Sequence, residues 1–155
     1  MKNDYIWILI LLVALGLFGA LLFSSPDAPE LGYYPVDVGG GSITIEDQNQ
    51  LQFVDFDAEL VAPGFITIHK TITEAPAEII GVTEYLEPGV YQGLKVFLNE
   101  EMAPGYKYAA ILHVDDGDGV FVVDLDFPVM TNGEVVRPYF LAIPEAERIL
   151  EPTEE

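Results

Sequence analysis

The sequence predicts an all-β fold, an antiparallel β-sandwich of immunoglobulin-like architecture, behind an N-terminal transmembrane helix. Residues 5–23 form an apolar run without a charged side chain. Residues 42–143 contain roughly seven or eight short segments of alternating or continuous apolar residues, separated by Pro, Gly and Asp turn signals. No amphipathic helical pattern occurs between them, so a sandwich is favoured over its alternative, a small barrel.

The first segment, residues 1–23, is expected to anchor the protein in the membrane. As a helix, the apolar run of about 19 residues spans about 28 Å, close to the thickness of a bilayer core. Lys2 precedes the run, and no Lys or Arg follows it before Lys70. The positive-inside rule therefore predicts a single-pass protein of the cell membrane, with a cytoplasmic N-terminus and an extracytoplasmic C-terminal domain. The alternative is a cleaved signal peptide, but the run is long for one and lacks a clean cleavage site.

The second segment, residues 24–41, is rich in Pro and ends in three glycines, which is typical of a stalk. Strands are then expected at 42–46 and 50–61, the second with a bulge because its apolar residues change face. A Pro-Gly turn leads into a strand at 65–69, whose alternation places three side chains on one face: Phe65, Thr67 and His69.

The remaining strands follow the same pattern of apolar segments between turns. The sequence Glu87-Pro88-Gly89 marks one of these turns. Residues 42–143 thus form the predicted sandwich domain, and residues 144–155 form an acidic tail. The further strands are expected at 79–86, 93–98, 106–114, 119–124 and 135–143.

Composition limits the partners of the chain. Its 155 residues include 26 Asp plus Glu against 6 Lys plus Arg, for a net charge of −20. This charge repels nucleic acid and anionic lipid, so no nucleic-acid partner is expected. It also fits a saline habitat, where salt screens the repulsion between carboxylates. The chain has no cysteine, which excludes disulfides and a blue-copper site.

The densest polar segment contains Asp115, Asp116 and Asp118, with glycines at 117 and 119. Closely spaced carboxylates around glycines are suited to Ca²⁺, which prefers oxygen ligands. The spacing differs from an EF-hand loop, and a tight Asp/Gly turn between strands is the favoured interpretation.

His69 and His113 are the two histidines of the chain, and each is expected near the end of a strand. If both lie at one end of the domain, they could bind Zn²⁺ or Cu²⁺ together with Asp115 or Asp116. The favoured alternative is that each imidazole bonds to loop backbone. Catalytic motifs such as G-x-S-x-G or a phosphate-binding loop do not occur in the sequence, so no enzyme activity is expected.

Three stretches resemble an uncharacterised exported domain, a domain of unknown function common in haloarchaeal cell-surface proteins. They are Pro63-Gly-Phe-Ile-Thr-Ile-His69, Gly81-Val-Thr-Glu-Tyr-Leu-Glu-Pro-Gly89, and His113-x-Asp115 through Gly119-x-Phe121. The resemblance covers about residues 42–142 and implies a cell-surface β domain without an assigned activity. It also places both histidines at motif positions.

The sequence therefore predicts a membrane-anchored, extracytoplasmic, non-enzymatic module for adhesion, envelope organisation or protein–protein contact. Its expected partners are the membrane, through residues 5–23, and a surface protein. The alternative is an exported metal-binding protein, with Ca²⁺ at the Asp/Gly loop or Cu²⁺ or Zn²⁺ at the two histidines.

Overall fold

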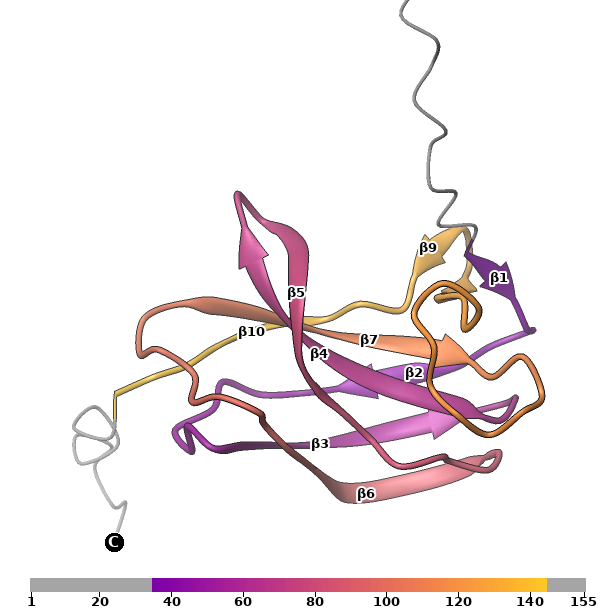
Figure 1. Ribbon diagram of the computed structural model, residues 1–155, viewed down its shortest axis with the longest axis horizontal. Helices are drawn as coiled ribbons and strands as arrows, with labels where there is room; N and C mark the ends of the chain where they lie inside the picture. Colours follow the sequence, from indigo (N-terminus) through magenta and orange to yellow (C-terminus); the bar gives the residue numbers. More distant parts are fainter. Residues whose placement is uncertain (1–34, 145–155) are drawn as a thin grey trace, which may run out of the picture. The chain divides into compact units, whose positions relative to one another are not determined.

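The computed structural model describes residues 35–144, which form β-strands joined by turns and loops (Figure 1). Within this range no helix occurs, and therefore no helix long and apolar enough to cross a membrane. The predicted all-β, antiparallel character is confirmed. The predicted anchor at 5–23 and the stalk up to residue 34 lie outside the described residues, as does the tail from residue 145.

The largest sheet has four strands in the order β10-β7-β4-β5. Its two central strands, β4 and β7, are antiparallel and pair from Gly64↔Val114 to Lys70↔Tyr108. Both are buried over most of their length on both faces, so other parts of the chain cover each side of this sheet. The four strands are β4 (Gly64–Ile72), β5 (Ala75–Val82), β7 (Lys107–Val114) and β10 (Tyr139–Leu141).

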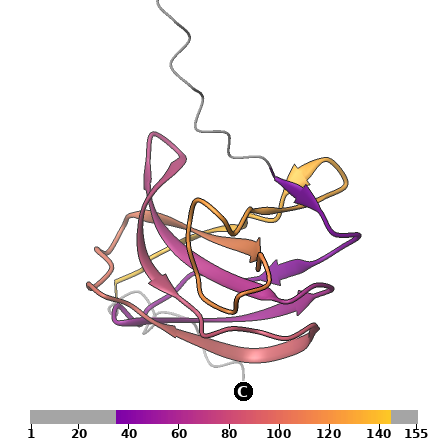
Figure 2. The ribbon, with the colours of Figure 1, turned by 45° about the vertical axis from the view of Figure 1, so that its right-hand side comes forward.

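A three-stranded sheet covers one of these faces. It consists of β2 (Ser42–Thr44), β3 (Phe53–Leu60) and β6 (Gly89–Phe97), in the order β2-β3-β6. Strand β3 alternates between buried apolar and more exposed residues, because one face packs inward and the other faces solvent. Figures 1 and 2 show this sheet beneath the four-stranded one. The core between them contains Val54, Phe56, Ile66, Ile68, Val96 and Leu112.

A third, smaller sheet joins β1 (Val36–Asp37), β8 (Val129–Thr131) and β9 (Glu134–Val135). Strand β1 pairs in parallel with β8, and the Val36 amide donates to the Pro128 carbonyl at 2.8 Å. Strand β1 lies inside the range predicted as stalk, 24–41. Two residues are too few to show an alternating pattern, so the sequence gives no local signal for this strand.

The strand predicted at 119–124 is wrong, because these residues belong to a loop. We call residues 115–128 the covering loop, since it lies over the outer face of the four-stranded sheet (Figure 2). The Leu125 and Asp126 amides both donate to the Val122 carbonyl at 2.8 Å, which closes a turn where a strand would continue.

The strand predicted at 135–143 is interrupted. Strand β9 ends at Val135 and β10 begins at Tyr139. Pro138 lies between them and has no amide hydrogen to donate, although its carbonyl accepts from Ala110 at 3.0 Å. The interruption lets this part of the chain pair with β8 first and with β7 afterwards.

Candidate functional site

Three buried polar side chains meet on the outer face of the four-stranded sheet. Thr67 and His69 come from β4, and His113 comes from the neighbouring strand β7. Their exposed fractions are 0%, 4% and 0%. Residues two apart on a strand share a face, which explains why Thr67 and His69 point the same way. We call these three residues the histidine cluster.

The Thr67 hydroxyl links the two imidazoles. Its Oγ1 lies 2.8 Å from His69 Nε2 and 3.1 Å from His113 Nε2. The Ile111 carbonyl is a third neighbour of this oxygen, at 3.4 Å. The two histidines, whose proximity the sequence left as a condition, therefore lie close together, with both rings in contact with one hydroxyl.

The other nitrogen of each ring bonds to the backbone. His69 Nδ1 lies 2.9 Å from the Ala77 carbonyl on β5, and His113 Nδ1 lies 2.8 Å from the Asp126 carbonyl. A carbonyl can only accept, so both Nδ1 atoms carry hydrogen. A neutral ring then has its lone pair on Nε2.

The surroundings favour neutral rings. Burial lowers the pKa of His113 to about 4, against the opposing effect of its bond to the Asp126 carbonyl. Burial likewise lowers the pKa of His69 below its usual value, opposed by the bond to Ala77. Two neutral imidazoles are therefore held with their Nε2 atoms toward the same oxygen.

The covering loop closes over His113. The ring of Phe121 lies edge-on at 5.3 Å from the His113 ring and 5.5 Å from the Phe65 ring. Asp126 is fully buried, and its carboxylate accepts from the Asp116 amide at 3.0 Å and the Val122 amide at 2.6 Å. These bonds hold both ends of the loop to one side chain.

The predicted calcium ligands also lie together. Ligand oxygens of Asp115, Asp116 and Asp118 are within 4.8 Å of one another. Each carboxylate accepts a backbone amide of the same loop, such as Gly119 to Asp115 at 3.0 Å. Within residues 35–144, these three aspartates form the one group of at least three possible metal ligands that lie this close together. Neither histidine belongs to the group. Both histidines instead bond to backbone carbonyls: His113 to one in the covering loop, as the favoured interpretation expects, and His69 to one on strand β5.

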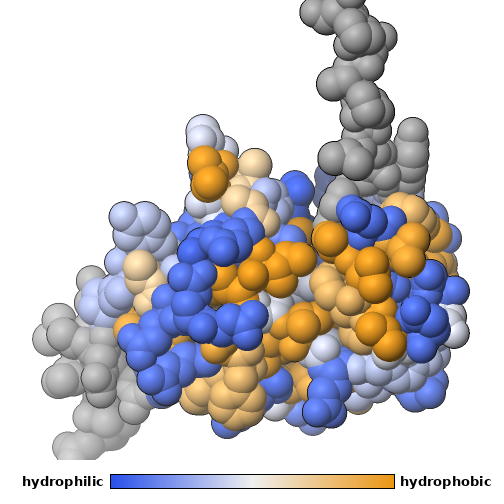
Figure 3. All heavy atoms as spheres, viewed as in Figure 1, coloured by the Kyte–Doolittle hydropathy of each residue, from blue (hydrophilic) through white to orange (hydrophobic). Residues whose placement is uncertain are grey.

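A cavity of about 370 Å³ borders His69. Most of its lining is apolar and comes from β5, β7, the covering loop and the small sheet, with Arg137 also at its edge. On the space-filling surface, apolar residues gather in the area of β5 and the covering loop (Figure 3). The histidine cluster is therefore buried, but one of its rings adjoins a hollow.

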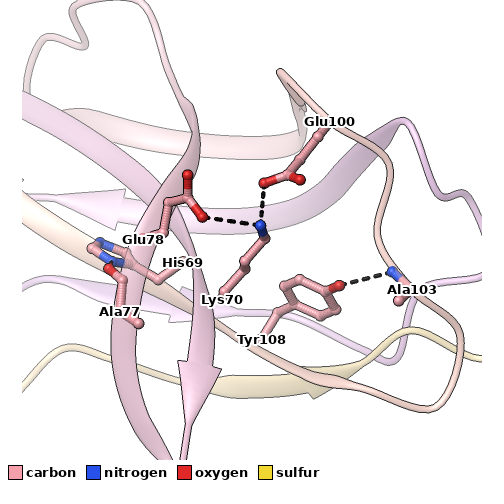
Figure 4. Close-up of polar contacts among 7 residues, drawn as sticks. All are labelled: His69, Lys70, Ala77, Glu78, Glu100, Ala103 and Tyr108. Atoms are coloured by element: carbon pink, nitrogen blue, oxygen red, sulfur yellow. Dashed lines mark hydrogen bonds and ion pairs between the residues drawn. The ribbon is translucent and has the colours of Figure 1, made fainter.

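An ion-pair group fixes β4 beside His69. Lys70 lies between Glu78 and Glu100, as Figure 4 shows, and these bonds raise the pKa of the lysine. In the same view the Tyr108 hydroxyl accepts from the Ala103 amide at 2.8 Å. Side chains of β4 and β7 thus bind the segment that follows β6.

Two residues of this region were not among the predicted site residues. Thr67 appeared in the sequence only as a member of the face shared with Phe65 and His69. Asp126 appeared only as one acid flanking an acid-rich segment. The signal for Thr67 was the alternation, whereas only the fold shows that Asp126 lies beneath the loop.

Comparison with known proteins gives the family. The family described as a domain of unknown function (DUF7282) matches residues 41–139. "Cell surface glycoprotein 2" of Haloarcula hispanica is 32% identical over 95 residues, which are 60% of this chain and 10% of that protein. No solved structure matches. The resemblance seen in the sequence motifs is confirmed, and the chain belongs to the DUF7282 family.

Proposed function

We propose that this protein is a non-enzymatic module of the cell surface, anchored by residues 5–23, whose folded domain contacts other proteins outside the membrane. The match to a protein named as a cell surface glycoprotein supports this most directly. The net charge of −20 agrees with it, since carboxylates keep a domain soluble in salt. Adhesion and envelope organisation are the roles that such contacts would serve.

The two packed sheets support a sandwich of immunoglobulin-like type as the finer description of the fold. They bury one core between them and leave the outer face of β3 to solvent. Such modules often present surfaces and loops to partners on a rigid frame. An experimental structure whose strand connections differ from that type would contradict this proposal.

Non-enzymatic action is supported by what the buried polar side chains do. Each histidine ring bonds to backbone, and the Asp126 carboxylate accepts two amides of the covering loop. Their bonds serve the fold. Glycosylation is not part of the proposal, because none of the four asparagines (Asn3, Asn49, Asn99 and Asn132) begins an Asn-x-Ser/Thr sequence.

The absence of cysteine from the chain allows a direct test of topology. Gln92→Cys places a single thiol at an exposed position on β6, and Asn3→Cys places one before the apolar run. We expect a membrane-impermeant maleimide to label the first variant on intact cells. The second should react only after lysis, and the parent chain should not react at all. Labelling of Asn3→Cys but not Gln92→Cys on intact cells would contradict the proposal.

A further inference from the structure

In the histidine cluster, the backbone holds each imidazole by its Nδ1 atom. In protein metal sites, a ligating imidazole usually donates its other N–H to a carbonyl or carboxylate, which fixes the tautomer and aims the lone pair. Both rings do so here, His69 to Ala77 and His113 to Asp126. The backbone of β5 and of the covering loop therefore orients both Nε2 atoms without help from a ligand.

The two Nε2 atoms also converge. Both contact Thr67 Oγ1, at 2.8 and 3.1 Å, and that hydroxyl has one hydrogen for two imidazoles and the Ile111 carbonyl. A cation beside this oxygen would be attracted by both imidazole lone pairs at once. The ligands come from paired central strands, which makes their positions rigid.

The chemistry of the ligands selects the ion. Imidazole nitrogens suit copper and zinc better than calcium or magnesium. The two imidazoles and the hydroxyl are buried and supply no negative charge, and the cost of burying an ion rises with the square of its charge. Both oxygens of the nearby Asp126 carboxylate already accept backbone amides. A singly charged ion that accepts two nitrogen ligands fits best.

We propose that His69 and His113 bind one cuprous ion through their Nε2 atoms, beside the Thr67 hydroxyl. The cavity of about 370 Å³ that borders His69 gives the ion a route to the cluster. This inference goes beyond the proposed surface role and does not depend on it, because copper binding and thiol labelling are separate measurements.

Anaerobic titration of the purified full chain in detergent tests the site, with bicinchoninate as a coloured competitor for Cu(I). We expect one ion per chain to be withdrawn from the competitor. His69→Gln and His113→Gln should each weaken binding at least tenfold. Asp118→Asn is the matched control, since it alters an exposed acid of the covering loop and should leave binding unchanged. Binding that survives both histidine variants would mean an adventitious ion only and would overturn the proposal.

A measurement on the parent chain covers the case in which a variant fails to fold. The chain has only two histidines, so a long-range ¹H–¹⁵N spectrum contains two sets of ring signals. We expect both rings to carry hydrogen on Nδ1, and Cu(I) to shift both Nε2 signals while the Nδ1 hydrogens remain. Unshifted Nε2 signals would overturn the proposal, and so would displacement of Cu(I) by equimolar Zn²⁺.

Discussion

At the scale of single residues, Gly64 shows how closely β4 and β7 approach. A Cβ atom on Gly64 would lie 1.9 Å from the His113 carbonyl oxygen, and backbone cannot move aside as a flexible side chain can. Gly64 also bonds to Leu86 in both directions, with its amide and its carbonyl. The glycine of the Pro-Gly turn is therefore required by packing as well as by the turn.

We expect Gly64→Ala to destabilise the protein by about 3 kcal/mol or more, because the methyl group forces the two central strands apart. Gly89→Ala is the matched control: its Cβ would meet nothing closer than 3.7 Å, and its φ is not positive. Gly89→Ala should change the free energy of unfolding by no more than about 1 kcal/mol. Urea denaturation of both variants measures the difference. Equal stabilities would show that the close approach does not constrain position 64.

At the scale of elements, the covering loop depends on one side chain. Asp126 accepts the Asp116 and Val122 amides, and its own carbonyl accepts from His113. The acidic residues nearer the tip serve only local turns. The loop is therefore held at its base.

Asp126→Ala should lower the free energy of unfolding by about 1–3 kcal/mol for each amide that loses its acceptor, since both amides lie in the closed loop. We expect faster hydrogen exchange at the Asp116 and Val122 amides and easier proteolysis of residues 115–128. Asp124→Ala removes an exposed acid and should change neither property. A loop that stays protected in Asp126→Ala would show that Phe121 packing alone holds it.

The start of the folded domain is a second question at this scale. A fragment of residues 35–144 retains β1 and its parallel pairing with β8, whereas a fragment of residues 42–144 lacks both. We expect both fragments to give β-type circular dichroism spectra, and the longer one to melt at a higher temperature. Identical melting temperatures would mean that β1 contributes nothing to stability.

The sequence predicted the elements that carry their own periodicity. In β3 apolar and acidic residues alternate from Val54 to Leu60, in β7 residues 108–112 are continuously apolar, and the burial of both strands follows these patterns. The covering loop was mistaken for a strand because Val120, Val122 and Val123 favour strands locally, while Asp126 and two glycines with positive φ impose turns. The sequence could not predict that His69 and His113 lie close together, because their proximity depends on the register between β4 and β7. A single sequence does not reveal that register.

At the scale of the whole molecule, charge dominates. The net charge of −20 disfavours a compact state until salt screens it. The structure pairs few of these acids: in the described part, ion pairs join Lys70 and Lys107 to three glutamates, Glu74, Glu78 and Glu100.

We therefore expect the melting temperature to rise steadily with sodium chloride. Calcium chloride at matched ionic strength should have a similar effect, because the Asp115, Asp116 and Asp118 carboxylates already accept loop amides. Differential scanning fluorimetry across both salts measures the two responses. A much larger rise with millimolar Ca²⁺ would instead establish a specific calcium site at these residues, since a ligand bound only by the folded state stabilises it.

Strand β1 has a mechanical consequence for a tethered domain. If residues 5–23 anchor the protein as proposed, a pull on the chain before residue 35 reaches Val36 and Asp37, which pair in parallel with β8, before it reaches β2. That pairing covers two residue pairs, fewer than the three that join β2 to β3, so we expect it to yield first and to free the chain up to residue 41. Fully extended, the seven residues 35–41 span at most about 24 Å at about 3.4 Å each, and the length gained is this span less the distance that they already cover in the fold. Under such a pull, the segment before β2 would lengthen while the two packed sheets remain folded.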